Sequence, residues 1–312
     1  MQKASLLFVL FLLIRSAVFG QAKVIDIADR LKLPPVVYDS LKQYRIILCG
    51  ETHGTNEAPE FIEGLARLWV NAGQKLMIAL EIPQNEQKYI DSFLLSGDFL
   101  IIQRMPFFTR KEQDGRSSAA MANLLKNMYG LKNLKVKFFD TDKPYSTGQE
   151  RDSMMADNVA GILKDNPDHK LILLAGDLHS RLTKGMGGNS SFVANSVEDF
   201  EKLSPAEQKT RMAKALEEGK YRPMGYFLEQ NKALFNQGIL ALQIDYKTGS
   251  YWACTDPMPN CKTQQVGSHY DRYENFSTKE NFLYVQPYYR EVIGYTGVLY
   301  STHISASRPL KE

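Results

Sequence analysis

Two apolar runs in this chain end in the same short pattern, in which a glycine is followed three residues later by a histidine. The run "ILCGETHG" presents Glu51 and His53, and the run "LILLAGDLHS" presents Asp177 and His179. A carboxylate beside an imidazole can carry out general acid–base chemistry or bind a divalent metal ion. Because the pattern occurs twice, we interpret both endings as parts of one functional site.

Two further carboxylates and two arginines are candidates for the same site. Glu81 lies in the apolar run "IALEIP", where a buried carboxylate costs free energy unless it has a partner. Asp140 ends the run "VKFFDT", where it can belong to the site or cap the next turn. Arg151 can hold these carboxylates or a substrate anion, and Arg116 in the loop "KEQDGRSS" is a second candidate. We expect the substrate contacts to come from Arg116, Asp140 and Asp177.

These residues follow segments that have the pattern of buried strands. Residues 45–50, 75–82, 135–140, 170–176 and 238–246 are apolar throughout, which is typical of strands covered on both faces. Helical patterns separate them. Arg151 and Asp152 open the helical pattern "RDSMMADNV", where Asp152 is interpreted as favouring the helix N-terminus. The alternation predicts an α/β fold with a largely parallel central sheet flanked by helices. Ligands bind such sheets beyond the carboxyl ends of the strands.

The second half of the chain departs from this alternation. Residues 184–236 begin with the turn-rich stretch "GMGGNSS" and continue as a polar helical segment, which we interpret as a helical insertion or lid. Residues 238–305 are rich in tyrosine and in strand-forming residues, so we expect a β-rich C-terminal segment. It includes a hairpin turning at Thr248-Gly249 and a final strand at "GVLYSTHIS".

The N-terminus has the pattern of an export signal. Lys3 precedes the apolar run "ASLLFVLFLLI", and "SAVFG" offers a small residue for cleavage after Gly20. We therefore expect a signal peptide at 1–20 and a secreted or periplasmic protein, with an uncleaved N-terminal anchor as the alternative. The remaining residues, 21–312, are enough for one large domain.

Charge and hydropathy narrow the classes of partner. Loss of Lys3 and Arg15 with the signal lowers the formal net charge from +3 to +1, and no basic run remains to bind nucleic acid. No second long apolar stretch follows, so no membrane span is expected after cleavage. The oligomeric state is not indicated by the sequence.

The three cysteines have different expected roles. Cys254 and Cys261 bracket the loop "CTDPMPNC", and in an exported protein this pair is expected to form a disulfide. Closing so short a loop would stabilise the fold by roughly 2–3 kcal/mol on the chain-entropy model. Cys49 lies in an apolar strand and is interpreted as a buried, unreactive thiol.

The order of these motifs resembles that of the erythromycin-esterase-like and ChaN-like superfamily, to which the Tiki proteases are related. The likeness begins at Gly50-Glu51-Thr52-His53-Gly54 and "EF" at Glu60-Phe61. It continues through "ALEIP", "FFDT", "RDSMMADNV", "AGDLHS", "PMGYFLEQ", "YKTGSYWA" and "YTGVLYSTHISASRPL". It covers most of residues 45–309.

The branches of this superfamily imply different chemistry. Likeness to the esterases implies that His53 is a general base that activates water. Glu51 and Glu81 would position this histidine or the water. Arg151 would orient the site, and His179 would assist. Likeness to the Tiki proteases implies a metal held by His53, Glu81 and His179. Likeness to the ChaN-like proteins implies haem binding.

Three hypotheses follow for a small-molecule site. The leading one is an exported hydrolase of an ester, lactone or amide bond. The second is a haem- or iron-binding protein, in which histidine and tyrosine are possible ligands. The third is a metal-dependent peptidase. The cofactor is left open between none, a divalent metal and haem.

Overall fold

A single twisted sheet organises the described part of the chain. The computed structural model describes residues 22–110, 114–185, 204–207, 209–210, 219–231, 238–255, 260–266, 279–286 and 294–310. Within these ranges nine strands form one sheet in the order β1-β8-β9-β6-β2-β5-β3-β4, and β7 pairs with β6. The strands are β1 (Lys23–Asp26), β2 (Ile46–Glu51), β3 (Leu76–Pro83), β4 (Leu134–Asp140), β5 (Lys170–Gly176), β6 (Ile239–Thr255), β7 (Asn260–Val266), β8 (Asn281–Val285) and β9 (Gly297–Ile304).

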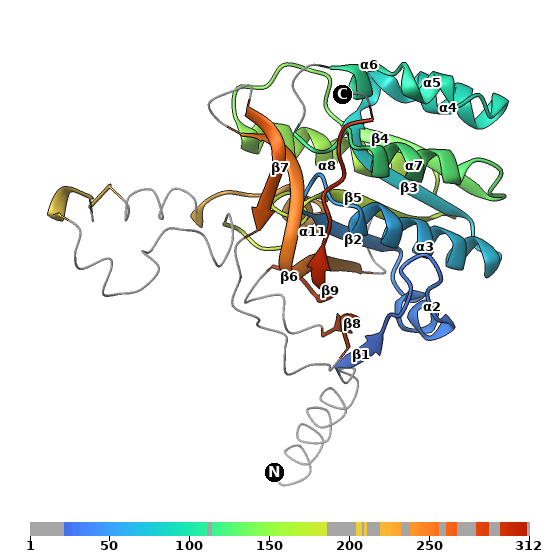
Figure 1. Cartoon of the computed structure of the whole chain (residues 1–312), viewed down its shortest axis with the longest axis horizontal. Helices are drawn as coiled ribbons and strands as arrows, with labels where there is room; N and C mark the ends of the chain where they lie inside the picture. Colours follow the sequence, from blue (N-terminus) through green and yellow to red (C-terminus); the bar gives the residue numbers. More distant parts are fainter. Residues whose placement is uncertain are drawn as a thin grey trace, which may run out of the picture.

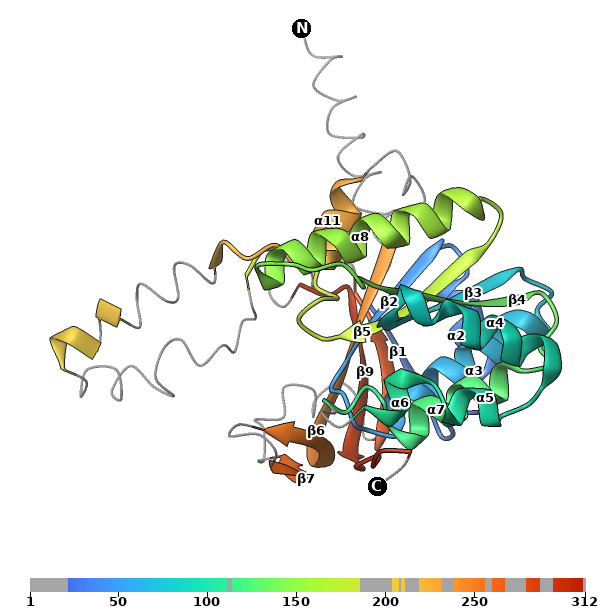
Figure 2. The same ribbon diagram turned by 90° about the horizontal axis from the view of Figure 1, so that it is seen from above.

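Helices cover both faces of this sheet. Figure 2 shows α8 and α11 on one side and the helices from α2 to α7 on the other. The helices are α2 (Pro35–Leu41), α3 (Glu57–Asn71), α4 (Gln87–Ser96), α5 (Leu100–Gln103), α6 (Pro106–Thr109), α7 (Ala119–Met128), α8 (Gly148–Asp165) and α11 (Met224–Gln230), with a 3-10 turn, η1 (Gln84–Glu86), before α4. The α/β fold that the sequence predicts is confirmed.

The sheet is largely parallel because its central strands are buried on both faces. β2 pairs in parallel with β5 and with β6, and β3 pairs in parallel with β5 and β4. Ile47 and Cys49 pack into the core beneath α3, whereas Ile46 and Leu48 pack into the core beneath α8. A strand with apolar neighbours on both sides needs no polar alternation, which explains the continuous apolar runs. Antiparallel pairs occur at β1–β8, β8–β9 and β6–β7.

The hairpin predicted at Thr248-Gly249 is wrong. β6 continues through both residues to Thr255, because Thr248 and Gly249 pair with His303 and Ile304 of β9. The reversal of the chain comes after Thr255, between β6 and β7. The expected disulfide is present there and joins Cys254 to Cys261, which face each other across this strand pair. Cys49 is a buried free thiol, as expected.

Two predicted segments lie largely outside the described residues. The expected signal at 1–20 is one of them, and most of the expected lid at 184–236 is the other. The described end of that insertion is α11, which packs against α8 and contributes the buried side chains of Met224 and Leu228. Among the described residues, none of the helices has the length and apolar character needed to cross a membrane.

The C-terminal segment after β9 returns to the loop that carries His53 (Figure 1). The Gly54 carbonyl accepts hydrogen bonds from the backbone N–H of Ser307 at 2.7 Å and from that of Trp252 in β6 at 3.0 Å. The backbone N–H of Asn56 donates to the Ser305 carbonyl at 3.0 Å. Gly54 has a φ of +77°, and a Cβ there would collide with the Trp252 carbonyl. The loop is therefore fixed by backbone contacts from two directions.

Candidate functional site

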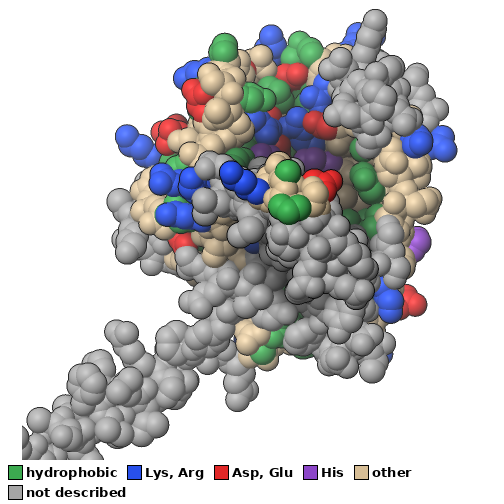
Figure 3. Space-filling model, turned by 90° about the vertical axis from the view of Figure 1, so that its left-hand side faces the viewer, with side chains coloured by type: hydrophobic (Ala, Val, Ile, Leu, Met, Phe, Trp, Pro, Cys, Tyr) green, Lys and Arg blue, Asp and Glu red, His purple; other side chains and the backbone are tan. Residues whose placement is uncertain are grey.

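The carboxyl ends of four adjacent strands form the rim on which the predicted residues meet. β2, β5, β3 and β4 are neighbours in the sheet, so their last residues lie side by side. Glu51 of β2 pairs with Gly176 of β5, which places the two Gly-x-x-His segments next to each other. Figure 3 shows histidine side chains at the bottom of a hollow, with arginine or lysine side chains beside them.

His53 is held by the carboxylate of Glu51, which ends β2 two residues earlier in the chain. Its Nδ1 lies 3.0 Å from Oε1 of Glu51, which is 4% exposed at the end of β2. As a carboxylate, Glu51 can only accept, so this contact places the proton on Nδ1 and the lone pair on Nε2. The Nε2 atom has no hydrogen-bond partner among the described residues and lies 3.9 Å from Oε2 of Glu81. The side chain of His53 is 23% exposed, so solvent reaches part of it.

Glu81 is the centre of the site and has its own set of donors. Oε1 accepts from Arg151 Nη2 at 2.6 Å and from Arg116 Nη1 at 3.0 Å. Oε2 accepts from the backbone N–H of Gly176 at 2.8 Å. These charged partners compensate for the burial of Glu81 within an apolar strand.

Asp140, at the end of β4, shares both guanidinium groups with Glu81. Its Oδ2 accepts from Arg116 at 2.9 Å and from Arg151 at 2.8 Å, and its Oδ1 accepts from Arg151 Nε at 3.0 Å. Asp114 completes the pairing of Arg116 by accepting from its Nε at 2.9 Å. Because most of their donors are already engaged, the two arginines act as structural ties between strands rather than as free anion receptors.

The helix α8 begins three residues before the position that the sequence suggested. Thr147 caps it by accepting from the backbone N–H of Glu150 at 3.1 Å, and the Glu150 side chain accepts from Ser146 N–H at 2.7 Å. Arg151 and Asp152 therefore lie inside the first turns and face the sheet. The interpretation of Asp152 as a residue that favours the helix N-terminus is wrong, because its carboxylate is fully buried and bonded to His179.

His179 has the same kind of setting as His53. Its Nδ1 lies 2.7 Å from Asp152 Oδ1, and its Nε2 lies 3.1 Å from Arg151 Nη1 and 3.9 Å from Glu81 Oε1. The two imidazole rings flank Gly176, since a Cβ at this glycine would be 3.0 Å from His53 Nε2 and 3.4 Å from His179 Cδ2. Each ring therefore has a carboxylate at Nδ1 and turns Nε2 toward Glu81.

The charges of the site shift its pKa values in opposite directions. Burial would raise the pKa of Glu81, but the charges of Arg116, His179, His53 and Arg151 outweigh it and hold that pKa well below the ordinary 4.5. Burial would lower the pKa of His53, yet the hydrogen bond to Glu51 and the nearby carboxylates raise it above 6.5. The pKa of His179 is also raised, because the charge of Glu81 and the bond to Asp152 outweigh burial. Burial raises the pKa of Glu51, and His53 opposes this.

Of the predicted site residues, the structure brings together all but one. Asp177 is the exception: its side chain is exposed and has no hydrogen bond to a described residue, while its backbone N–H donates to the Glu51 carbonyl at 3.0 Å. Sequence reasoning missed Asp152, Asp114 and Tyr221, whose hydroxyl donates to Asp152. The residues that converge are Glu51, His53, Glu81, Arg116, Asp140, Arg151 and His179.

The ligand set expected for a metal does not fit this arrangement. Among the described residues, no three histidine, cysteine or acidic side chains are placed to hold a metal ion. Both oxygens of Glu81 already accept hydrogen bonds, and Nε2 of His179 contacts Arg151. Two guanidinium groups beside the carboxylate would repel a cation. His53, Glu81 and His179 therefore do not form a set of metal ligands among the described residues.

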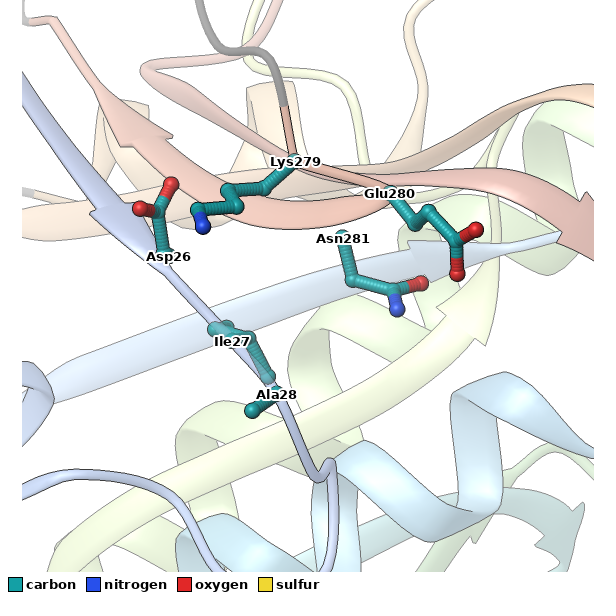
Figure 4. Close-up of a pocket in the computed structure, with 6 residues that line it drawn as sticks. All are labelled: Asp26, Ile27, Ala28, Lys279, Glu280 and Asn281. Atoms are coloured by element: carbon teal, nitrogen blue, oxygen red, sulfur yellow. The ribbon is translucent and has the colours of Figure 1, made fainter.

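A separate pocket lies at the β1 edge of the sheet. Its volume is about 410 Å³, and none of the predicted site residues lines it. Figure 4 shows the side chains of Asp26 and Lys279 pointing toward each other across it. Its lining residues are Asp26, Ile27, Ala28, Lys279, Glu280 and Asn281.

Solved structures with the same fold span nearly the whole chain. An erythromycin esterase, a mutant of EreC in its open conformation, is 12% identical with a TM-score of 0.58, over 94% of this chain and 100% of that one. A Bacillus cereus protein is 10% identical with a TM-score of 0.57, over 92% and 97%. A succinoglycan biosynthesis protein is 8% identical with a TM-score of 0.55, over 91% and 95%.

More distant matches carry no weight for function. The haem-binding ChaN of Campylobacter jejuni aligns with a TM-score of 0.38 and 13% identity. No protein-family model matches the sequence, and no curated protein matches it. Likeness at such low identity establishes the fold alone. The chain therefore has an erythromycin-esterase-like fold.

Proposed function

We propose that this chain is a hydrolase of an ester, lactone or amide bond, in which His53 activates water. The observation that carries the proposal is the environment of that imidazole. Nδ1 is bound by a buried carboxylate, and Nε2 has no hydrogen-bond partner among the described residues. His179 is the weaker candidate for the base, because Arg151 lies at hydrogen-bond distance from its Nε2.

The reaction follows from this placement. Water loses a proton to His53 Nε2 while its oxygen forms a bond to the carbonyl carbon of the substrate. The carbonyl carbon becomes tetrahedral and its oxygen becomes an oxyanion. The intermediate then collapses, the bond to the leaving group breaks, and the leaving oxygen or nitrogen takes the proton from His53. A carboxylic acid and an alcohol or amine result.

The test is the replacement of His53 by alanine. We expect kcat/KM for p-nitrophenyl butyrate and for a simple lactone to fall by roughly 10²–10⁴-fold, the contribution of one positioned acid–base group. The thermal midpoint should change little. His303→Ala is the matched control, because this exposed histidine lies outside the site and contacts Thr248 at 3.3 Å. Full activity in His53→Ala would refute the mechanism.

The pH dependence of the wild type adds a second readout. Only neutral imidazole can accept the proton, and the pKa of His53 is raised above 6.5. The value of kcat/KM should therefore rise as the pH passes through the pKa of His53. It should level off at a pH above 6.5, the ordinary pKa of histidine. Titration with haemin tests the binding alternative. A Soret shift that is abolished in His53→Ala would favour haem binding over hydrolysis.

We also propose that the protein acts outside the cytoplasm. The support is the signal-like pattern at 1–20 together with the disulfide between Cys254 and Cys261, a bond that persists in oxidising compartments. Thiol titration of the protein isolated from its native compartment should find one free cysteine after unfolding. Three free thiols would count against export.

A further inference from the structure

Asp152 is a buried carboxylate whose three partners come from two separate parts of the chain, the segment after β5 and the segment at the start of α11. It lies in α8 and is 0% exposed. Oδ1 lies 2.7 Å from His179 Nδ1 and accepts from the backbone N–H of Met224 at 2.9 Å. Oδ2 accepts from the hydroxyl of Tyr221. A carboxylate taken fully out of water is tolerated only when its oxygens are bonded in this way.

Two contacts select the same tautomer of His179. Asp152 as a carboxylate can only accept, which requires a proton on Nδ1. The Arg151 guanidinium, 3.1 Å from Nε2, can only donate, which requires a lone pair there. Asp152 and Arg151 therefore both select the tautomer with the proton on Nδ1. Only one orientation of the ring allows both hydrogen bonds.

We propose that Asp152 is a positioning residue that holds His179 in this tautomer and orientation. Tyr221 and the Met224 amide anchor the carboxylate to α11. They thereby link the end of the 184–236 segment to an imidazole beside Gly176. The inference rests on the proposed hydrolase function and adds to it an assisting role for His179 beside His53. Asp152 touches neither water nor substrate in this scheme, and its effect passes through His179.

The chain offers a matched set of variants. Asp152→Asn keeps the shape of the side chain: its amide oxygen can accept from His179 and Met224, and its amide nitrogen can donate to the Tyr221 oxygen. The charge is lost while the packing is kept. Tyr221→Phe removes one donor to Asp152 and leaves the bond to His179. Asp157→Asn is the control, because Asp157 is an exposed aspartate on the same helix.

The first readout is spectroscopic and does not depend on activity. In the purified chain labelled with ¹⁵N-histidine, we assign His179 by its absence from the His179→Gln spectrum. We expect ¹⁵N shifts of an Nδ1–H tautomer and a strongly downfield Nδ1 proton. In Asp152→Asn that proton should move upfield, in Tyr221→Phe it should move less, and in Asp157→Asn it should stay. An unchanged Nδ1 proton in folded Asp152→Asn would overturn the proposal.

The second readout is the kinetics of p-nitrophenyl butyrate hydrolysis. We expect kcat of Asp152→Asn to fall on the order of 100-fold, the lower end of what one positioned acid–base group contributes. KM should be unchanged, because substrate does not contact Asp152. A wild-type kcat would refute the positioning role. If the wild type hydrolyses none of the probes, the proposed function fails, whereas the spectra still decide the state of His179.

Discussion

Gly176 separates the two imidazole rings, and the spacing leaves no room for a side chain. A methyl group there would lie 3.0 Å from His53 Nε2 and 3.3 Å from Cε1 of the same ring. The ring would have to move by a few tenths of an ångström, which weakens its contact with Glu51. The glycine is therefore a requirement of the site geometry, although it supplies no functional group.

The substitution Gly176→Ala tests this requirement. We expect kcat to fall roughly 10–100-fold, because small displacements of a catalytic group have effects of that size. Gly161→Ala in α8 is the control, since a Cβ there would meet nothing within 4 Å. That change should stabilise the helix by about 0.5–1 kcal/mol and leave the kinetics unchanged. Equal kinetics in both variants would contradict the argument.

At the same scale, the sequence predicted most of the residues that converge on the site and missed Asp152, Asp114 and Tyr221. His53, Glu51, Asp140 and His179 were found because the end of a parallel strand is a recognisable position. Asp152 was missed because the helix start was placed at Arg151, whereas α8 begins at Gly148 and has completed its first turn before Asp152. Asp177 also follows a strand, but its side chain is exposed and makes no hydrogen bond to a described residue, so its predicted contact with substrate stays a prediction.

At the scale of elements, the segment after β9 acts as a brace for two loops. Ser307 donates its backbone N–H to Gly54, and its hydroxyl oxygen accepts from the backbone N–H of Ala120 at 2.9 Å. Ala120 lies in the first turn of α7, where backbone N–H groups have no partner within the helix. One serine thus connects the His53 loop with the start of a helix on the same face.

The change Ser307→Ala should therefore destabilise the fold. We expect a loss of about 1–2 kcal/mol in the free energy of unfolding by urea, since a part-buried N–H loses its acceptor. Ser92→Ala is the comparison, because Ser92 is exposed and its hydroxyl bonds only within α4, to the Lys88 carbonyl at 2.7 Å. A loss no greater than that of Ser92→Ala would show that the brace is not needed.

At this scale, the sequence predicted the strands whose residues are apolar throughout. It failed where the extent of a strand depends on its pairing with another strand. The central strands were placed closely because apolar runs on both faces leave few alternatives. The short strand β1 at the edge of the sheet and its neighbour β8 have no such signal. β6 was cut at Gly249 because glycine is typical of turns, whereas β9 pairs with it and keeps the chain extended.

At the scale of the whole molecule, one network of charges joins strands, loop and helix. Glu81 of β3 and Asp140 of β4 share Arg116 from the loop before α7 and Arg151 from α8. These side chains are at most 14% exposed, so solvent screens their attraction weakly. Removal of one of these four side chains would leave an oppositely charged side chain buried without that partner.

Acid should therefore unfold the protein partly through Glu81. Its pKa is depressed in the folded state, so its contribution to stability is complete above the unfolded value near 4.5 and disappears as pH falls below it. At pH 7, Glu81→Gln should cost roughly 3–5 kcal/mol, because the buried arginines lose a partner. Equilibrium unfolding in urea between pH 2 and about 7 checks both effects.

The expected slopes separate this variant from a control. Below pH 4.5 the stability of Glu81→Gln should fall less steeply with acid than that of the wild type, because one titrating group is gone. Asp39→Asn, in an exposed pair with Lys42, should leave stability at pH 7 unchanged. Parallel pH curves for wild type and Glu81→Gln would show that the network does not govern acid unfolding.

The loop at Gly54 has a consequence for how mutational maps of this protein are read. Its carbonyl is the meeting point of β6 and the C-terminal segment, and any Cβ would strike the backbone at Trp252. In a saturation library selected for activity, every substitution at Gly54 would be depleted as completely as substitutions at His53. Depletion would then mark a place where three stretches of backbone pack without intervening side chains. Intolerance to change and participation in chemistry are separate properties, and this glycine has only the first.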